Sequence, residues 1–128
     1  MSGPAASGLF IYANDISRLA TFYESILGMA RRHATSDLVV LLGNGLQLVI
    51  HALAPEIATA VAISDPPVPR DNAPLKFFFT VPSLATAREM APTLGGMVLS
   101  QEYSGRGFRA SNAVDPEGNI FHLRESAA

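Results

Sequence analysis

The stretch NDISRLATFYESILGM, residues 14–29, combines the signals of a helix start, an amphipathic helix and a helix stop. Asp15 or Ser17 can cap the first turn, because their side-chain oxygens accept hydrogen bonds from the free backbone amides there. Gly28 is a natural stop, since glycine readily takes the left-handed conformation that ends helices. Between them, apolar residues recur at the spacing of a helix that buries one face: Leu19, Phe22, Tyr23, Ile26 and Leu27. The stretch therefore predicts a helix packed against a partner.

Strands are predicted on both sides of this helix. Residues 9–13 (LFIYA) precede it, and residues 29–34, 38–42 and 46–53 follow it. The letters GNG at 43–45 indicate a tight hairpin between the last two strands, because Asn and Gly tolerate the positive φ of such turns. The predicted order is strand, helix and three strands.

The same order occurs a second time. A strand over 76–81 (KFFFTV) precedes a helix that begins at Pro82 and Ser83 and runs to Leu94, and Gly95-Gly96 ends that helix. Three more strands are expected over 97–103, 108–114 and 119–124. LGM at 27–29 and GGM at 95–97 occupy matching places in the two halves. In predicting the fold, we give an internal repeat of this kind more weight than any single motif.

The repeat predicts an α+β fold in which two βαβββ units form a cup-shaped mixed sheet with the helices outside. We place unit one at about residues 8–53 and unit two at about 75–125, within a single domain over 1–128. The connection over 54–74 holds five prolines and a possible short helix at 56–63. A connection this long is usually a linker or a binding loop, and a role in pairing or as a lid stays open.

Composition narrows the functional classes. Hydrophobic residues make up 48% and charged residues 16% of 128 residues, which is typical of one globular domain. The net charge is −2 and the basic residues form no run, so we expect no nucleic-acid partner. Without cysteine there is no disulfide, thiolate zinc site or cysteine nucleophile. The start MSGPAASG is unlike a signal peptide, and polar residues and glycines break the longest uncharged run, so we expect a cytoplasmic protein with no membrane partner.

The two βαβββ units, the opening NDISRLATFYESILGM and the closing DPEGNIFHL at 115–123 resemble the vicinal oxygen chelate superfamily. That group contains glyoxalase I, bleomycin resistance proteins and extradiol dioxygenases. The resemblance covers roughly residues 8 to 125. It implies a cup-shaped sheet, a ligand site in the cup and often a homodimer, but no particular reaction, because function depends on the site.

The resemblance also implies four metal-ligand positions in metal-dependent members. In this sequence they fall on Gly8, Gln47, Lys76 and His122. Lysine repels a metal ion, glycine has no side chain, and no carboxylate is left to balance metal charge. Adding His51 to Gln47 and His122 still gives a poor ligand set. We therefore expect no metal and no cofactor, with a divalent metal as the alternative.

Strand alternation assigns the cup-facing residues independently of the resemblance. The strongly apolar face of each strand should pack under the helices, and the mixed face should line the cup. The residues predicted to face the cup are Phe10, Tyr12, Gln47, His51, Lys76, Phe78, His122 and Arg124. Arg106 lies between two glycines, on a loop that could cover the cup.

These residues predict a cup that binds a small organic anion with an apolar or aromatic body. Lys76, the only lysine of the chain, and Arg124 would meet the negative charge, while His122 and Gln47 would bind polar edges of the ligand. The first functional hypothesis is thus a metal-free binding protein similar to the bleomycin resistance branch. A metal-dependent lyase, isomerase or dioxygenase, and a metal-free enzyme with His122 or Lys76 as general base, remain alternatives.

Several of these residues also have a purely structural interpretation. His122 could be a half-exposed strand histidine, and Lys76 an exposed residue at the start of a strand. Residues 31–33 are predicted to lie on the surface and the three phenylalanines at 77–79 mainly in the core. Asp115 and Glu117 are predicted to be turn residues and not an acid–base pair, because Asp-Pro-x-Gly is itself a turn signal.

Overall fold

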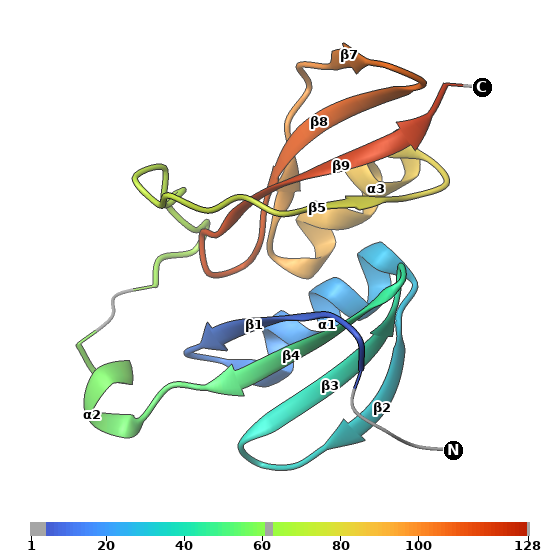
Figure 1. Cartoon of the computed structure of the whole chain (residues 1–128). Coiled ribbons are helices and arrows are strands. Elements are labelled where there is room, and N and C mark those ends of the chain that lie inside the picture. Colours follow the sequence, from blue (N-terminus) through green and yellow to red (C-terminus); the bar gives the residue numbers. More distant parts are fainter. Residues whose placement is uncertain (1–4, 61–62, 128) are drawn as a thin grey trace. The chain divides into compact units, whose positions relative to one another are not determined.

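The computed structural model of the chain describes residues 5–60 and 63–127. It contains two compact units, residues 1–62 and 63–128, and the boundary falls inside the proline-containing segment 54–74 (Figure 1). Each unit has its own mixed sheet, so the predicted α+β class and the repeat of strand, helix and further strands are confirmed. None of the helices in the described part of the chain is long and apolar enough to cross a membrane.

The first unit follows the predicted order of elements closely. Its elements are β1 (Gly8–Ala13), α1 (Ile16–Leu27), β2 (Ala30–Ala34), β3 (Leu38–Gly43), β4 (Leu46–Ala52) and α2 (Pro55–Ala58). The strands lie in the order β1-β4-β3-β2 (Figure 1). β1 and β4 are parallel, and the other two pairs are antiparallel.

Helix α1 forms as the opening stretch predicts. Asp15 is the N-cap, and its carboxylate accepts a hydrogen bond from the Arg18 amide at 3.1 Å. Gly28 ends the helix in the left-handed conformation with φ 64°. The apolar face is buried against β3 and β4, where Leu41, Leu48 and Ile50 have no exposed surface. Burial of each large apolar side chain contributes roughly 1.5–3 kcal/mol, so this interface is the core of the unit.

The β3–β4 hairpin and the β2 edge also agree with expectation. Asn44 and Gly45 have φ values of 52° and 75°, as a tight hairpin turn requires. The predicted surface residues 31–33 are exposed. Arg31 forms an ion pair with Glu24 of α1, with 3.0 Å between the nitrogen and the oxygen. Charged, exposed residues suit an edge strand, because they oppose pairing with other chains.

The second unit contains β5 (Phe78–Thr80), α3 (Leu84–Met90), the 3₁₀ helix η1 (Ala91–Leu94), β6 (Met97–Val98), β7 (Tyr103–Gly105), β8 (Phe108–Val114) and β9 (Ile120–Ser126). The strand order is β5-β9-β8-β6, and β7 also pairs with β8. β5 and β9 are parallel, and the remaining pairs are antiparallel. β5 is shorter than the predicted strand 76–81, so Lys76 precedes it.

Two other elements differ from the prediction. The strand expected over 97–103 is divided into β6 and β7, because side chains take backbone carbonyls between them: Arg88 donates to the Leu99 oxygen at 3.1 Å, and Ser111 donates to the Gln101 oxygen at 3.0 Å. The helix expected to run to Leu94 changes to a 3₁₀ turn that contains Pro92, which has no amide hydrogen for an α-helical bond.

The segment 54–74 contains a shorter helix than expected. α2 covers four residues, and residues 61–62 of the expected helix 56–63 lie outside the described part of the chain. Further along, Arg70 binds the turn between β8 and β9. Its amide donates to the Gly118 oxygen at 2.7 Å, and its Nε donates to the Glu117 oxygen at 2.9 Å. The later part of this segment is therefore part of the second unit.

The Asp-Pro-Glu-Gly turn is buried and organised by Asp115. The Asp115 carboxylate accepts hydrogen bonds from the amides of Glu117 at 2.9 Å and Asn119 at 3.0 Å, and from the Asn119 side chain at 2.8 Å. Asp115 has no exposed surface and Glu117 is 4% exposed. The prediction that these residues form a turn is confirmed. The turn fixes where β9 begins, and with it the positions of His122 and Arg124.

Gly118 should be hard to replace. Its φ is +89°, and an added Cβ would lie 2.3 Å from the Val68 carbonyl oxygen. We expect Gly118→Ala to lower the free energy of unfolding by about 2–4 kcal/mol, from backbone strain and the clash together. Gly28→Ala is the matched control, because Gly28 also has a positive φ but has open space around it. Equal losses for the two variants in urea unfolding would show that the contact with Val68 contributes nothing.

Candidate functional site

The open face of the second sheet carries a group of basic and aromatic side chains. We call it the Arg124 cluster: Lys76, Phe78, Phe108, Asn112, His122 and Arg124. His122 pairs with Phe78 on one side and with Asn112 on the other, so the three side chains form a row across the sheet. The neighbouring Phe121 and Leu123 point to the opposite face and are fully buried. The face predicted for His122 and Arg124 from strand alternation is confirmed.

Arg124 is held in place by two aromatic rings. Its guanidinium carbon lies 3.6 Å from the centre of the Phe78 ring and 4.0 Å from the centre of the Phe108 ring. Both distances are within the range of cation–π attraction. Its Nε donates a hydrogen bond to His122 Nε2 at 2.9 Å, and the His122 ring stacks on Phe78 with 5.4 Å between ring centres. These contacts orient the guanidinium before any ligand arrives.

The guanidinium of Arg124 can only donate, so its hydrogen bond to His122 requires an unprotonated Nε2. Burial lowers the pKa of His122 below its ordinary value of 6.5, and the positive charges of Arg124 and Lys76 lower it further. Because Nε2 accepts the hydrogen bond from Arg124, the proton of the neutral ring lies on Nδ1. His122 therefore presents a hydrogen-bond donor at its remaining ring nitrogen.

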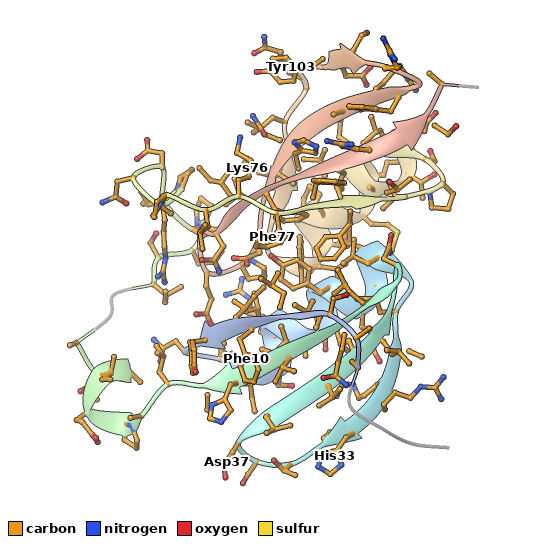
Figure 2. All side chains as sticks on the ribbon, in the orientation of Figure 1. Phe10, His33, Asp37, Lys76, Phe77 and Tyr103 are labelled. Carbon is orange, nitrogen blue, oxygen red and sulfur yellow. The ribbon has the colours of Figure 1, made fainter. Side chains whose placement is uncertain are left out.

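Lys76 lies on the chain that leads into β5 (Figure 2). Its ammonium donates a hydrogen bond to the Asn112 side-chain oxygen at 3.2 Å. Within the described residues, neither Lys76 nor Arg124 has a carboxylate at ion-pairing distance. By contrast, Arg88 and Arg109 are each paired with glutamate. The Arg124 cluster is thus a basic surface without its own counter-charge.

The first unit carries a different, aromatic group on its own open face. We call it the Tyr12 cluster: Phe10, Tyr12 and His51. The ring centres are 6.1 Å apart for Phe10 and Tyr12, 5.6 Å for Tyr12 and His51, and 6.5 Å for Phe10 and His51. Phe10 and Tyr12 are 58% and 57% exposed. His51 Nδ1 donates a hydrogen bond to the Ala52 carbonyl oxygen at 2.8 Å.

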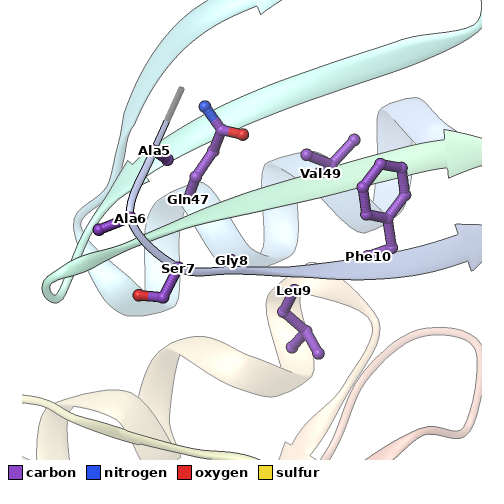
Figure 3. Close-up of a pocket in the computed structure, with 8 residues that line it drawn as sticks. All are labelled: Ala5, Ala6, Ser7, Gly8, Leu9, Phe10, Gln47 and Val49. Atoms are coloured by element: carbon purple, nitrogen blue, oxygen red, sulfur yellow. The ribbon is translucent and has the colours of Figure 1, made fainter. Parts of the chain in front are cut away.

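An open pocket of about 470 Å³ lies beside Phe10 (Figure 3). Gly8, Phe10, Gln47 and Val49 are among its lining residues, and none of the described residues that line it is charged. Gln47, Val49 and Phe10 point to the same side of the sheet, and Leu9 points to the other. The structure thus brings together the predicted residues Phe10 and Gln47.

The strand register of the two sheets corrects one of the four positions that the resemblance assigns to metal ligands. Phe10 and Phe78 each lie five residues before the N-cap of the following helix. Phe10 pairs with Val49, whereas Phe78 pairs with His122. The counterpart of His122 is therefore Val49, and the alignment of Gln47 with that position was wrong by two residues. Sequence landmarks missed this because they do not show the strand register.

This correction weakens the case for a metal site at the positions that metal-dependent members use. Valine has no donor atom, so the four positions become Gly8, Val49, Lys76 and His122. A glycine, a valine and a cationic lysine do not suit a divalent ion. Among the described residues, no three His, Asp or Glu side chains lie close enough together to hold a metal ion. The residues present do not fit the metal that the resemblance implies for other members.

Arg106 lies in a tight turn. Gly105 pairs with Phe108, so only Arg106 and Gly107 connect β7 and β8, and Gly107 has a φ of 80°. Arg106 is exposed. A two-residue hairpin turn does not form the mobile covering loop that the flanking glycines suggested. Its role in ligand binding stays a prediction. The adjacent Gly105 allows the Phe108 ring to cover the backbone, because an added Cβ would overlap that ring.

Comparison with known proteins identifies the family. A family model described as a glyoxalase-like domain matches residues 8–124. The chain belongs to the glyoxalase-like domain family. This confirms the resemblance to the vicinal oxygen chelate superfamily. No curated protein matches the sequence.

Solved structures share the fold of this glyoxalase-like domain at low sequence identity. A glyoxalase/bleomycin resistance protein/dioxygenase family enzyme from Burkholderia phytofirmans is 16% identical, with a TM-score of 0.70 over 94% of this chain and 97% of that chain. A glyoxalase-related enzyme from Fulvimarina pelagi is 19% identical, with a TM-score of 0.68 over 94% and 87%. The fosfomycin resistance protein FosX from Listeria monocytogenes is 17% identical, with a TM-score of 0.66 over 99% and 95%. These similarities establish the fold.

Sequence reasoning missed two residues of the Arg124 cluster in this glyoxalase-like domain. Phe108 and Asn112 share one side of β8, and Asn112 lies opposite His122. The strand reads FRASNAV, with apolar residues on both faces, so alternation alone does not select its open face. The even spacing of Phe108 and Asn112 was the available signal, but it needed the pairing with β9 to be interpreted.

Proposed function

We propose that this glyoxalase-like domain binds a small organic anion at the Arg124 cluster, without a metal. The observation that supports this most directly is an oriented guanidinium on a face that also carries a lysine. Neither cation has a carboxylate partner among the residues that the structure describes. A partly desolvated cation is costly unless an anion compensates its charge. An organic oxyanion would supply that charge and accept hydrogen bonds from both residues.

The surroundings of Arg124 favour an anion with an apolar or aromatic body. Phe78 is 50% exposed, and Phe108 flanks the other side of the guanidinium. The terminal nitrogens of Arg124 can donate to a carboxylate, sulfonate or phosphonate, while the rings contact the rest of the ligand. Because the guanidinium is already oriented by stacking, binding loses less side-chain entropy than it would with a free arginine.

On the first unit, the residues Phe10, Tyr12 and Gln47 carry no charge. The Tyr12 cluster is aromatic and exposed, and Gln47 lines the nearby pocket. We propose that these residues bind uncharged groups. The single cup that joins both sets of residues stays a prediction, as does the homodimer that the resemblance implies.

Binding suits the Arg124 cluster better than catalysis by His122. A general base needs a free lone pair, and the His122 lone pair on Nε2 accepts the hydrogen bond from Arg124. His122 could take a proton only after that bond is broken.

The name of the Listeria neighbour states resistance to fosfomycin, a small phosphonate. That likeness makes phosphonates reasonable members of the test set.

A panel of charged and neutral ligands on one ring tests the proposal. We expect benzenesulfonate, benzoate and phenylphosphonate to raise the melting temperature of the protein, and the neutral benzenesulfonamide and benzamide not to. The anions should also lose affinity as salt is raised, because the interaction is largely electrostatic. Equal shifts with neutral and charged ligands, or no shift with any anion, would contradict the proposal.

A further inference from the structure

Tyr103 is an exposed aromatic residue of the second unit that the Arg124 cluster does not include. It lies on β7 (Figure 2), directly opposite Ala110 of β8. Ala110 in turn lies opposite Arg124 of β9, so Tyr103, Ala110 and Arg124 form one row across three neighbouring strands. The side chains of residues directly opposite each other point to the same side of a sheet. Tyr103 therefore shares the open face with Arg124.

Arg124 and Tyr103 lie close enough together to bind one small molecule. Neighbouring strands are about 4.8 Å apart, so the backbones of the two residues lie about 10 Å apart, on either side of β8. The alanine between them is too short to separate the two long side chains. Phe108 connects the two places, because its ring lies 4.0 Å from the Arg124 guanidinium carbon and would overlap a Cβ added to Gly105 of β7. The surroundings of Arg124 thus extend to β7.

The hydroxyl group of Tyr103 is available to a ligand. Tyr103 is 49% exposed, and its hydroxyl has no hydrogen-bond partner among the residues that the structure describes. A phenol can both donate and accept a hydrogen bond.

The charged end of the row is available as well. Arg124 Nε donates to His122, whereas the two terminal nitrogens of Arg124 have no hydrogen-bond partner in the described part of the chain. No buried side-chain nitrogen or oxygen in that part lacks a partner, so these terminal nitrogens are accessible. The row therefore presents a cation at one end and a hydroxyl group at the other.

We propose that Tyr103 is a further ligand-binding residue, which hydrogen-bonds a second polar group on the anion that Arg124 binds. The inference rests on the proposed function and narrows its ligand class to ring-containing anions with a hydroxyl or carbonyl group on the ring. Arg124 binds the charged end, the ring lies across β8 beside Phe108, and Tyr103 binds the far end. Two polar contacts at separate ends fix the orientation of the ligand, which a single contact does not.

Tyr103→Phe removes the hydroxyl group and keeps the aromatic ring. Because the hydroxyl has no partner among the described residues, the variant should have the wild-type stability in urea unfolding. The test ligands are benzoate, 3-hydroxybenzoate and 4-hydroxybenzoate, which have the same charge and differ only in one hydroxyl group and its position. Calorimetric titration gives the ratio of each hydroxybenzoate affinity to the benzoate affinity in the same protein.

We expect the wild type to bind at least one of the two hydroxybenzoates about two- to tenfold more tightly than benzoate, which is the net effect of one hydrogen bond. In Tyr103→Phe this ratio should fall to about one, because the partner of the ligand hydroxyl is gone. The affinity for benzoate itself should stay within about twofold of the wild type, since benzoate has no group for Tyr103 to bind.

Two results would overturn the inference and leave the proposed function standing. One is a wild type that binds benzoate but gains no affinity from either hydroxyl group, and the other is a Tyr103→Phe variant that keeps the wild-type ratio. Tyr12→Phe is the comparison variant, because Tyr12 is the other exposed tyrosine and lies on the first unit. A ratio lost in Tyr12→Phe but kept in Tyr103→Phe would assign the second polar group to the first unit. If benzoate does not bind to the wild type, the proposed function fails and the inference fails with it.

Discussion

Replacing Arg124 by methionine should weaken the binding of benzenesulfonate about 10- to 100-fold, because hydrogen bonds to charged groups contribute roughly 1.5–3 kcal/mol each. Methionine keeps an apolar chain of similar length between the rings of Phe78 and Phe108. Its thioether also packs well against aromatic side chains. The variant should therefore fold while it loses the guanidinium.

The same variant has a readout that needs no ligand. Arg124 is one cause of the lowered pKa of His122, so its removal should raise that pKa toward the ordinary value. Burial, which is the largest cause, and the positive charge of Lys76 should keep the pKa of His122 below its ordinary value of 6.5. NMR titration of the His122 ring measures the shift. An unchanged pKa of His122, or unchanged sulfonate binding, would show that Arg124 does not act on this site as described.

Asp115→Ala should have the largest effect on stability. The substitution removes the acceptor for the buried amide of Glu117 and for the half-buried amide and side chain of Asn119. Each buried donor left without a partner costs about 1–3 kcal/mol, so we expect the free energy of unfolding to fall by roughly 3–5 kcal/mol. Against a typical total of about 5–15 kcal/mol, much of the stability would be lost.

Asp37→Ala is the control for that variant. Asp37 is exposed, and its replacement should change the free energy of unfolding by less than about 0.5 kcal/mol. Urea unfolding of the two variants and the wild type gives the comparison. Similar stabilities for Asp115→Ala and Asp37→Ala would contradict the structural role of the turn. NMR signals of His122 in Asp115→Ala would report whether the turn also positions β9.

The repeat of helical and strand patterns was enough to predict most elements. Helix α1 and the β3–β4 hairpin depend on neighbours in the sequence, and their signals at Asp15, Gly28 and Asn44 are local. The second half was less predictable because distant side chains determine it. Arg88 and Ser111 divide a predicted strand by binding carbonyls that lie 11 and 10 residues away along the chain.

The sequence predicted which face of its strand His122 and Arg124 occupy, but not which residues lie opposite each other on neighbouring strands. Strand alternation placed His122 and Arg124 on one face, and the structure agrees. It did not show that Asn112 lies opposite His122, or that Val49 is the counterpart of His122. Both facts depend on strand register, which turns and packing set together.

The central claim, that uncompensated basic residues of the second unit bind an organic anion, is tested most directly by calorimetric titration of benzenesulfonate into the wild type and Lys76→Met. Arg32→Met is the matched control, because it removes an exposed positive charge from β2 of the first unit. We predict saturable binding to the wild type and to Arg32→Met, and no measurable binding to Lys76→Met. Binding of benzenesulfonate to Lys76→Met with the affinity of the wild type would contradict the claim.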